Sequence, residues 1–186
     1  DEAAARKNAE AVVNLIVGKQ SAQYGDLDHD GEVTDTGDGY GLLLNGESPG
    51  YTGGVYSHTT YAMTTGDAPA SVILHGGHVE ACITNVEDWS VQLRDLALNI
   101  LASPFDGNMR GIIVQAVGLA DQIVNGVDLN GDEQINPIPG EGGVKTAYQH
   151  AYYMADILIL LGQGQVMPPG PTPQAVPATP ENYDGG

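Results

Sequence analysis

The sequence predicts an all-α fold with four or five helices packed around one core. Apolar residues recur at steps of three and four along most of the chain, which indicates helices that bury one face. No segment alternates at period two, so almost no strand is expected. The chain has 186 residues and 41% hydrophobic content, which is enough for one domain with a buried core.

Helical spacing is present in five segments: residues 9–17, 53–65, 79–101, 109–127 and 144–161. The longest of them ends where Pro104 and the Asp106-Gly107 pair favour a turn. Upstream of that helix, Gly76 and Gly77 weaken any helix at that point.

Two regions are expected along the chain. Residues 1–163 form a helical domain, and residues 164–186 form a proline-rich tail, because six of the eleven prolines fall between Pro168 and Pro180. Within the helical domain, a weak repeat of helix, acidic loop and helix covers residues 8–66 and 107–161. The long helix between these segments joins the two halves.

The net charge of the chain argues against some classes of binding partner. There are 24 acidic and 6 basic residues, and a formal charge of −18 repels nucleic acids and anionic membrane surfaces. No apolar run is long enough to span a bilayer, so membrane insertion is not expected. Cations are the natural partners of such a chain.

The first residue leads us to expect export, and the cysteine content excludes an internal disulfide. The chain starts at Asp1 without a methionine, which we interpret as a mature secreted or cell-surface form after removal of a signal peptide. Cys82 is the only cysteine, so no disulfide can form within the chain.

The first acidic loop begins at Asp26. In a loop whose alternate side chains turn toward one centre, acidic residues at positions one, three and five supply oxygen ligands, and Gly31 at position six permits a sharp turn. Calcium is a hard cation that takes about six to eight such ligands. The ligands expected here are Asp26, Asp28, Asp30, Glu32 through its backbone carbonyl, and Asp35 or Asp38 as the closing acid.

The second acidic loop begins at Asp128 and has the same spacing of oxygen-bearing side chains. Its closing acid arrives late, just before the next helix, where a carboxylate also suits the helix N-terminus. The ligands expected here are Asp128, Asn130, Asp132, Gln134 through its carbonyl, and Glu141 as the bidentate closing ligand.

Each loop departs from the usual pattern at one or two positions. Gly37 stands at position twelve of the first loop, where a closing Glu is usual. In the second loop, glycine is at position four as Gly131, and Glu133 takes position six. At position eight, the aliphatic Val33 and Ile135 are expected to anchor the loops to the core.

The two loops resemble the calcium loops of EF-hands and of dockerin-type modules, over the loops and their exits only. The resemblance implies about two calcium ions per chain. The four methionines are scattered along the sequence rather than gathered in one groove, which favours a static brace over a calcium sensor.

A second group of metal-ligating residue types is present. His75, His78 and Cys82 are spaced three and four residues apart, which puts them along one side of a helix, and His58 and His150 are on other expected helices. Such residues can bind haem, copper or another borderline metal, although histidines that only pack or form hydrogen bonds are commoner.

The leading hypothesis is an exported, calcium-stabilised structural protein that self-associates into a fibre or surface layer, with its tail docked on a neighbour. Deletion of residues 165–186 is then expected to abolish assembly in light scattering. No enzyme signature is present, so catalysis is not expected. The alternatives are a calcium-braced module with a ligand or glycan groove near Tyr56, Tyr61 and Trp89, and a helical redox protein with His-ligated haem or copper.

Overall fold

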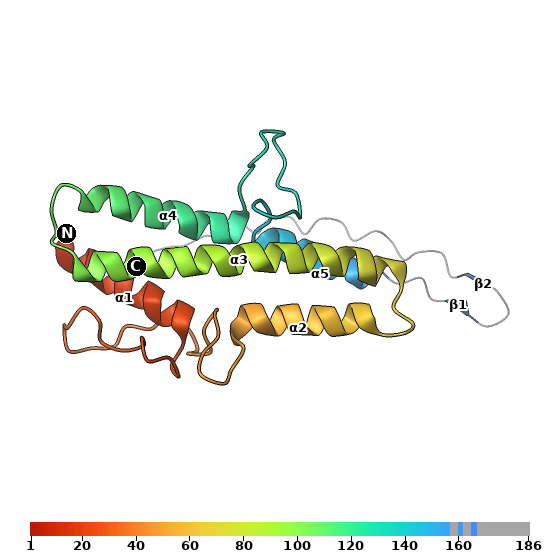
Figure 1. Ribbon diagram of the computed structural model, residues 1–186, viewed down its shortest axis with the longest axis horizontal. Coiled ribbons are helices and arrows are strands. Elements are labelled where there is room, and N and C mark those ends of the chain that lie inside the picture. Colours follow the sequence, from red (N-terminus) through yellow and green to blue (C-terminus); the bar gives the residue numbers. More distant parts are fainter. Residues whose placement is uncertain (157–159, 162–164, 167–186) are drawn as a thin grey trace, which may run out of the picture. The chain divides into compact units, whose positions relative to one another are not determined.

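The computed structural model describes residues 1–156, 160–161 and 165–166 of the chain (Figure 1). Helices dominate the described residues, which confirms the all-α prediction. The elements are α1 (Glu2–Val17), α2 (Gly50–Thr64), α3 (Ala70–Ala102), α4 (Met109–Asn125), α5 (Val144–Met154), β1 (Leu160–Leu161) and β2 (Gln165–Val166). None of the helices in the described part of the chain is long and apolar enough to cross a membrane.

Helix α3 is the centre of the helical unit, and each of the other four helices packs against it. In Figure 1, α2 and α5 lie along its N-terminal half, and α1 and α4 lie along its C-terminal half. The two acidic loops join α1 to α2 and α4 to α5, so the expected repeat of helix, loop and helix is arranged on either side of α3.

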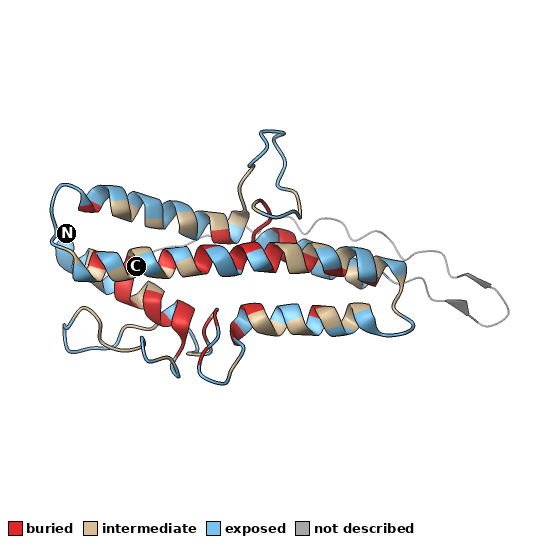
Figure 2. Cartoon of the chain, viewed as in Figure 1, coloured by how far each residue is buried: buried red, intermediate tan, exposed pale blue. Residues whose placement is uncertain are grey.

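The main core lies between α1, α3 and α4, and buried residues follow α3 along its length (Figure 2). Val13 and Ile16 of α1 are fully buried, and they belong to the same cluster as Val86 and Trp89 of α3 and Met109 of α4. Burial of side chains of this size contributes about 1.5–3 kcal/mol each. The core therefore holds the helix that precedes the first acidic loop firmly in place.

Helix α3 begins at Ala70, earlier than the expected start at residue 79, and it continues through Gly76 and Gly77. Glycine costs a helix about 1 kcal/mol, but here one of the two allows close packing. A Cβ atom on Gly76 would lie 2.5 Å from the Cγ and Sδ atoms of Met63 on α2. The absence of a side chain at Gly76 thus lets α2 approach α3.

The last helix is shorter than predicted. Helix α5 ends at Met154, whereas the periodicity of the sequence predicts a helix to residue 161. The prediction was wrong at Leu160 and Leu161, because these residues form a strand in which Leu160 pairs antiparallel with Val166 and Leu161 with Gln165. The compact units divide between Asp156 and Ile157, before the expected boundary at residue 163. Most of the expected proline-rich tail, residues 164–186, lies outside the described residues.

Candidate metal centres in the two acidic loops

The acidic side chain at position one organises both loops in the same way. In the first loop, Asp26 Oδ2 accepts a hydrogen bond from the backbone N–H of Gly31 at 3.1 Å. In the second, Asp128 Oδ2 accepts one from the backbone N–H of Glu133 at 2.8 Å. Both donors hold position six, so each loop folds back on its own first residue.

The side chains at positions three and five also form matching hydrogen bonds in the two loops. Asp28 and Asn130 each accept, through Oδ1, a hydrogen bond from the backbone N–H two residues later, at 3.0 and 2.9 Å. Asp30 and Asp132 do the same at 2.8 and 2.9 Å. Each of these side chains uses its Oδ1 atom to shape the backbone. The second carboxylate oxygen of Asp30 accepts from Lys7 at 3.4 Å and that of Asp132 accepts from the Asn136 amide at 3.1 Å, whereas Asp28 keeps its second oxygen for a ligand bond.

The backbone also turns at matching places. Positions four and six have positive φ in both loops: 62° at His29 and 93° at Gly31 in the first, 78° at Gly131 and 65° at Glu133 in the second. Left-handed backbone favours glycine, but other residues adopt it when the surrounding structure compensates. The different placement of glycine therefore does not change the loop conformation.

Glu10, a residue that sequence reasoning missed, closes the first loop from helix α1. Its side chain is fully buried, and its carboxylate accepts backbone N–H donors from Leu27 at 2.6 Å, Asp28 at 3.0 Å and Thr34 at 2.5 Å. Thr34 holds position nine. In the second loop the position-nine donor, Asn136, bonds to the buried Glu141 at 3.1 Å. Glu10 and Glu141 thus accept the same backbone N–H, at position nine, although Glu10 precedes its loop in the sequence and Glu141 follows its loop.

Asn14 ties the same loop to α1. Its Nδ2 donates to the carbonyl oxygens of Gly25 at 3.0 Å and Thr34 at 2.9 Å, and its Oδ1 accepts the N–H of Gly25 at 3.0 Å. Asn14 is fully buried. The start and the exit of the loop are therefore held together by a single side chain.

Three carboxylates converge in the first loop. Glu10, Asp26 and Asp28 each offer an oxygen atom, and these atoms lie within 4.8 Å of one another. None of the ion pairs found among the described residues involves any of the three. At that separation two carboxylates repel by about 3 kcal/mol at an effective dielectric constant of about 20. A bound divalent cation would remove this repulsion.

One oxygen of this group has no hydrogen-bonding partner. Asp26 Oδ1 is buried, whereas Asp26 Oδ2 is bonded to Gly31. A buried polar atom without a partner costs about 1–3 kcal/mol, which a metal–oxygen bond would offset. The three carboxylates provide the hard-oxygen chemistry that calcium prefers.

The two acids expected to close the first loop are not part of this group. Asp35 accepts the hydroxyl of Tyr24 at 2.9 Å and lies 3.9 Å from Lys19. Asp38 accepts the backbone N–H of Tyr40 at 2.8 Å and the hydroxyl of Tyr51, whose hydrogen bond holds the pKa of Asp38 below its usual value. Asp38 thus connects the loop exit to helix α2.

The remaining predicted ligands of the first loop lie at its rim. Lys7 Nζ lies 3.4 Å from Asp30 and 3.5 Å from Glu32. The Glu32 side chain is 78% exposed, which leaves only its backbone for the carbonyl role expected at position seven. The hydrogen bond from Lys7 to Asp30, with Glu32 adding to it, raises the pKa of Lys7.

The second loop is held by Asn85 of α3. This buried side chain donates to the carbonyl oxygens of Ile138 at 2.9 Å and Gly142 at 3.0 Å, and accepts the N–H of Gly140 at 2.7 Å. Among the described residues, the acids of this loop do not gather within 4.8 Å as those of the first loop do. Closure of the second loop around an ion would therefore require the loop to contract.

The expected aliphatic anchors at position eight were wrong. Val33 is 50% exposed and Ile135 is 38% exposed. Instead, Leu27 and Val127, at the start of each loop, pack against the main core.

The histidines and the cysteine are divided among separate places. His75 and His78 of α3 meet His150 of α5, whereas His58 is exposed on α2 beside Tyr61. Cys82 is fully buried in a small cluster with Val79, Ile83 and Ala147, and burial raises the pKa of its thiol to about 11. Cys82 is not part of the histidine group.

The aromatic side chains proposed for a glycan groove do not share one surface. Trp89 belongs to the main core and is only 6% exposed, whereas Tyr56 and Tyr61 project from α2. Trp89 is therefore not available as the wall of a groove.

Comparisons with protein-family models, with curated proteins and with solved structures found no match to this chain.

Proposed function

We propose that this protein is a calcium-binding helical structural protein in which the ions brace the junctions between helices. The observation that carries the proposal is the convergence of Glu10, Asp26 and Asp28 without a cationic side chain, together with the partnerless oxygen of Asp26. The shared backbone geometry of the two loops extends the proposal to the Asp128 loop. We expect the first loop to bind more tightly, because its carboxylates already lie close together.

A bracing role is supported by how the first loop is attached. Glu10 and Asn14 are buried on α1 and hold both ends of the loop, so an ion there would couple α1 to the exit that leads into α2. A sensor instead exposes a methionine-rich groove on binding. Here Met109 is buried in the main core and Met63 packs against Gly76, which favours a fixed structure.

Export and self-association are parts of the same proposal. Self-association is supported by aliphatic side chains that α4 leaves in solvent: Val114 is 63% exposed and Val117 is 64% exposed. The docking segment that the sequence suggested, residues 164–186, lies almost wholly outside the described residues. Light scattering of the full chain and of the chain without residues 165–186 remains its test.

Thermal melting with and without calcium tests the proposed function. At a calcium concentration about 100 times the dissociation constant, each filled loop adds about 2.7 kcal/mol to the free energy of unfolding. For a chain of this size, one filled loop is expected to raise Tm by about 5–10 °C relative to the same sample in chelator. Magnesium at the same concentration is the control and is expected to have a smaller effect, because it demands a more rigid octahedral shell. Identical melting curves in calcium and in chelator would contradict the proposal.

A further inference from the structure

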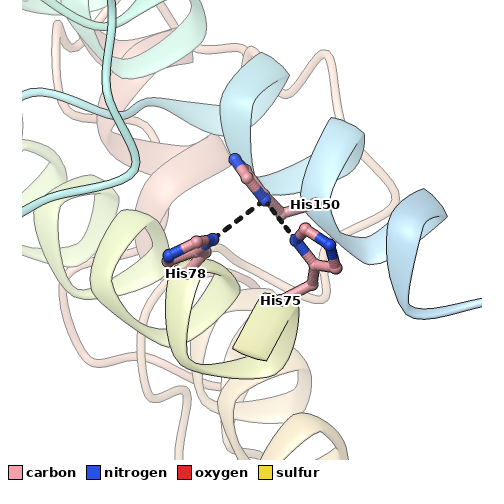
Figure 3. A group of neighbouring side chains, drawn as sticks. All are labelled: His75, His78 and His150. Atoms are coloured by element: carbon pink, nitrogen blue, oxygen red, sulfur yellow. Dashed lines mark hydrogen bonds between the residues drawn. The ribbon is translucent and has the colours of Figure 1, made fainter. Parts of the chain in front are cut away.

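Three histidine side chains from two helices point toward one another (Figure 3). His75 and His78 are one turn apart on α3, and His150 faces them from α5. The Nδ1 atom of His150 lies 3.0 Å from Nδ1 of His75 and 3.1 Å from Nδ1 of His78. All three rings are partly buried. This cluster is separate from both acidic loops.

Hydrogen bonding alone does not account for this arrangement. A neutral imidazole has one N–H and one acceptor nitrogen, so Nδ1 of His150 can be donor or acceptor but offers one well-directed bond. It faces two nitrogens at hydrogen-bond distance. Within the described residues, the hydrogen bonds of these rings run only among the rings themselves, and no carboxylate bonds to them. One nitrogen is therefore always left poorly satisfied.

The protonation state of the cluster suits a metal ion. Burial, with the neighbouring His78 and His75 adding to it, lowers the pKa of His150 to about 4. Burial and the nearby His75 also lower the pKa of His78. Neutral imidazole is the form that ligates metals.

We propose that His75, His78 and His150 form a binding site for one divalent transition-metal ion, with Zn²⁺ as the best fit. Zinc binds imidazole nitrogen at about 2.0–2.1 Å in tetrahedral geometry, which places ligand nitrogens about 3.3 Å apart. The observed separations of 3.0 and 3.1 Å are close to that value. One nitrogen of each of the three rings lies within 4.8 Å of the others, so the rings must draw closer together for one ion to reach all three.

The site leaves one coordination position for an additional ligand. Three imidazoles and an open fourth position are the arrangement of zinc sites that hold a water molecule or a small anion. The ring of Tyr153 lies beside the cluster, with its centroid 5.2 Å from that of His75 and 5.6 Å from that of His150. Its hydroxyl is held by Gln149 at 2.7 Å. Three nitrogens this close together suit a bare ion rather than a haem, whose porphyrin occupies four positions around the iron.

Cobalt titration of the metal-free full chain tests this site. Co²⁺ takes the place of Zn²⁺ in tetrahedral sites and gives strong visible absorption bands there. The titration is run in millimolar calcium so that the acidic loops are occupied. We expect one Co²⁺ per chain with tetrahedral bands, and loss of the bands when one equivalent of Zn²⁺ is added.

Two variants assign the site. His150→Gln is expected to weaken Co²⁺ binding by more than about 10–100-fold, because loss of a direct ligand costs more than loss of a residue that only orients one. His58→Gln is the matched control: this histidine is exposed on α2 and outside the cluster, so binding is expected to be unchanged. Far-UV circular dichroism in chelator checks that the variants fold. If His150→Gln does not fold, His75→Gln replaces it as the test of the site.

Two results would overturn the proposal. The first is wild-type protein that shows no tetrahedral Co²⁺ spectrum. The second is binding that persists in the His150→Gln and His75→Gln variants or that disappears in Asp26→Asn, because the metal would then be held by the acidic loop. Neither result depends on whether calcium fills the loops, so this site and the calcium proposal succeed or fail separately.

Discussion

Replacement of Glu10 by Gln is expected to lower the free energy of unfolding by about 4 kcal/mol in millimolar calcium and by only about 1–2 kcal/mol in chelator. In both conditions the substitution replaces one acceptor oxygen of Glu10 with an NH₂ group. That group then faces either the backbone N–H of Thr34 or the backbone N–H groups of Leu27 and Asp28, which lose their acceptor. In chelator, part of this loss is offset, since a neutral side chain no longer repels Asp26 and Asp28. In calcium, a ligand is lost as well.

The difference between the two conditions is therefore the diagnostic quantity, and urea unfolding in calcium and in chelator measures it. Glu32→Gln is the control, because this side chain is exposed and position seven offers only its backbone carbonyl. Its effect on unfolding is expected to be small and equal in both conditions, because its ion pair with Lys7 is exposed to solvent. An equal loss in calcium and in chelator for Glu10→Gln would show that Glu10 is a structural residue without a metal.

Asn85→Ala is expected to lower the free energy of unfolding by about 3 kcal/mol, because it leaves the carbonyls of Ile138 and Gly142 and the N–H of Gly140 without their partner. Asn85 is only 6% exposed, so water replaces these bonds poorly. The same change is expected to weaken calcium binding at the Asp128 loop and to leave the Asp26 loop intact.

Urea unfolding and calcium titration measure these two effects. Thr84→Ala is the neighbouring control: Thr84 is exposed, and its hydroxyl bonds only to the carbonyl of Glu80 on the same helix. It is expected to be close to neutral. If Asn85→Ala unfolds at the same urea concentration as the wild type, the exit of the second loop does not depend on this clamp.

The helices could be predicted because burial of one face imposes its period on the sequence. Val13 and Ile16 on α1, and Val86 and Trp89 on α3, are buried as their spacing indicates. Helix ends were harder to predict. Helix α3 continues through Gly76 because packing against Met63 compensates for a local propensity that opposes the helix.

The residues that hold the loops from the helices were missed, although Glu141 was expected, because they lie outside the loops in sequence. Glu10 and Asn14 lie on the buried face of α1, and Asn85 lies on the buried face of α3. A polar residue at a position where the helical period demands an apolar one was the available signal. It marks a side chain whose polar atoms must be satisfied by something packed against the helix, but it does not identify the partner.

The conformation of the loops was also only partly accessible from sequence. Gly31 stands at position six and Gly131 at position four, yet His29 and Glu133 adopt the left-handed backbone that completes the same pattern in both loops. In the second loop, the hydrogen bond that the N–H of Glu133 donates to Asp128 offsets part of the cost of that conformation. Such compensation depends on the folded loop and not on local propensity.

Equilibrium dialysis of the full chain against millimolar calcium, with excess magnesium present, tests the calcium assignment most directly. We expect about two calcium ions per wild-type chain. One is expected to be lost in Asp26→Asn and the other in Asp128→Asn. The site that survives in Asp128→Asn is expected to be the tighter one. Wild-type protein that binds no calcium under these conditions, or binding that neither substitution reduces, would contradict the calcium assignment.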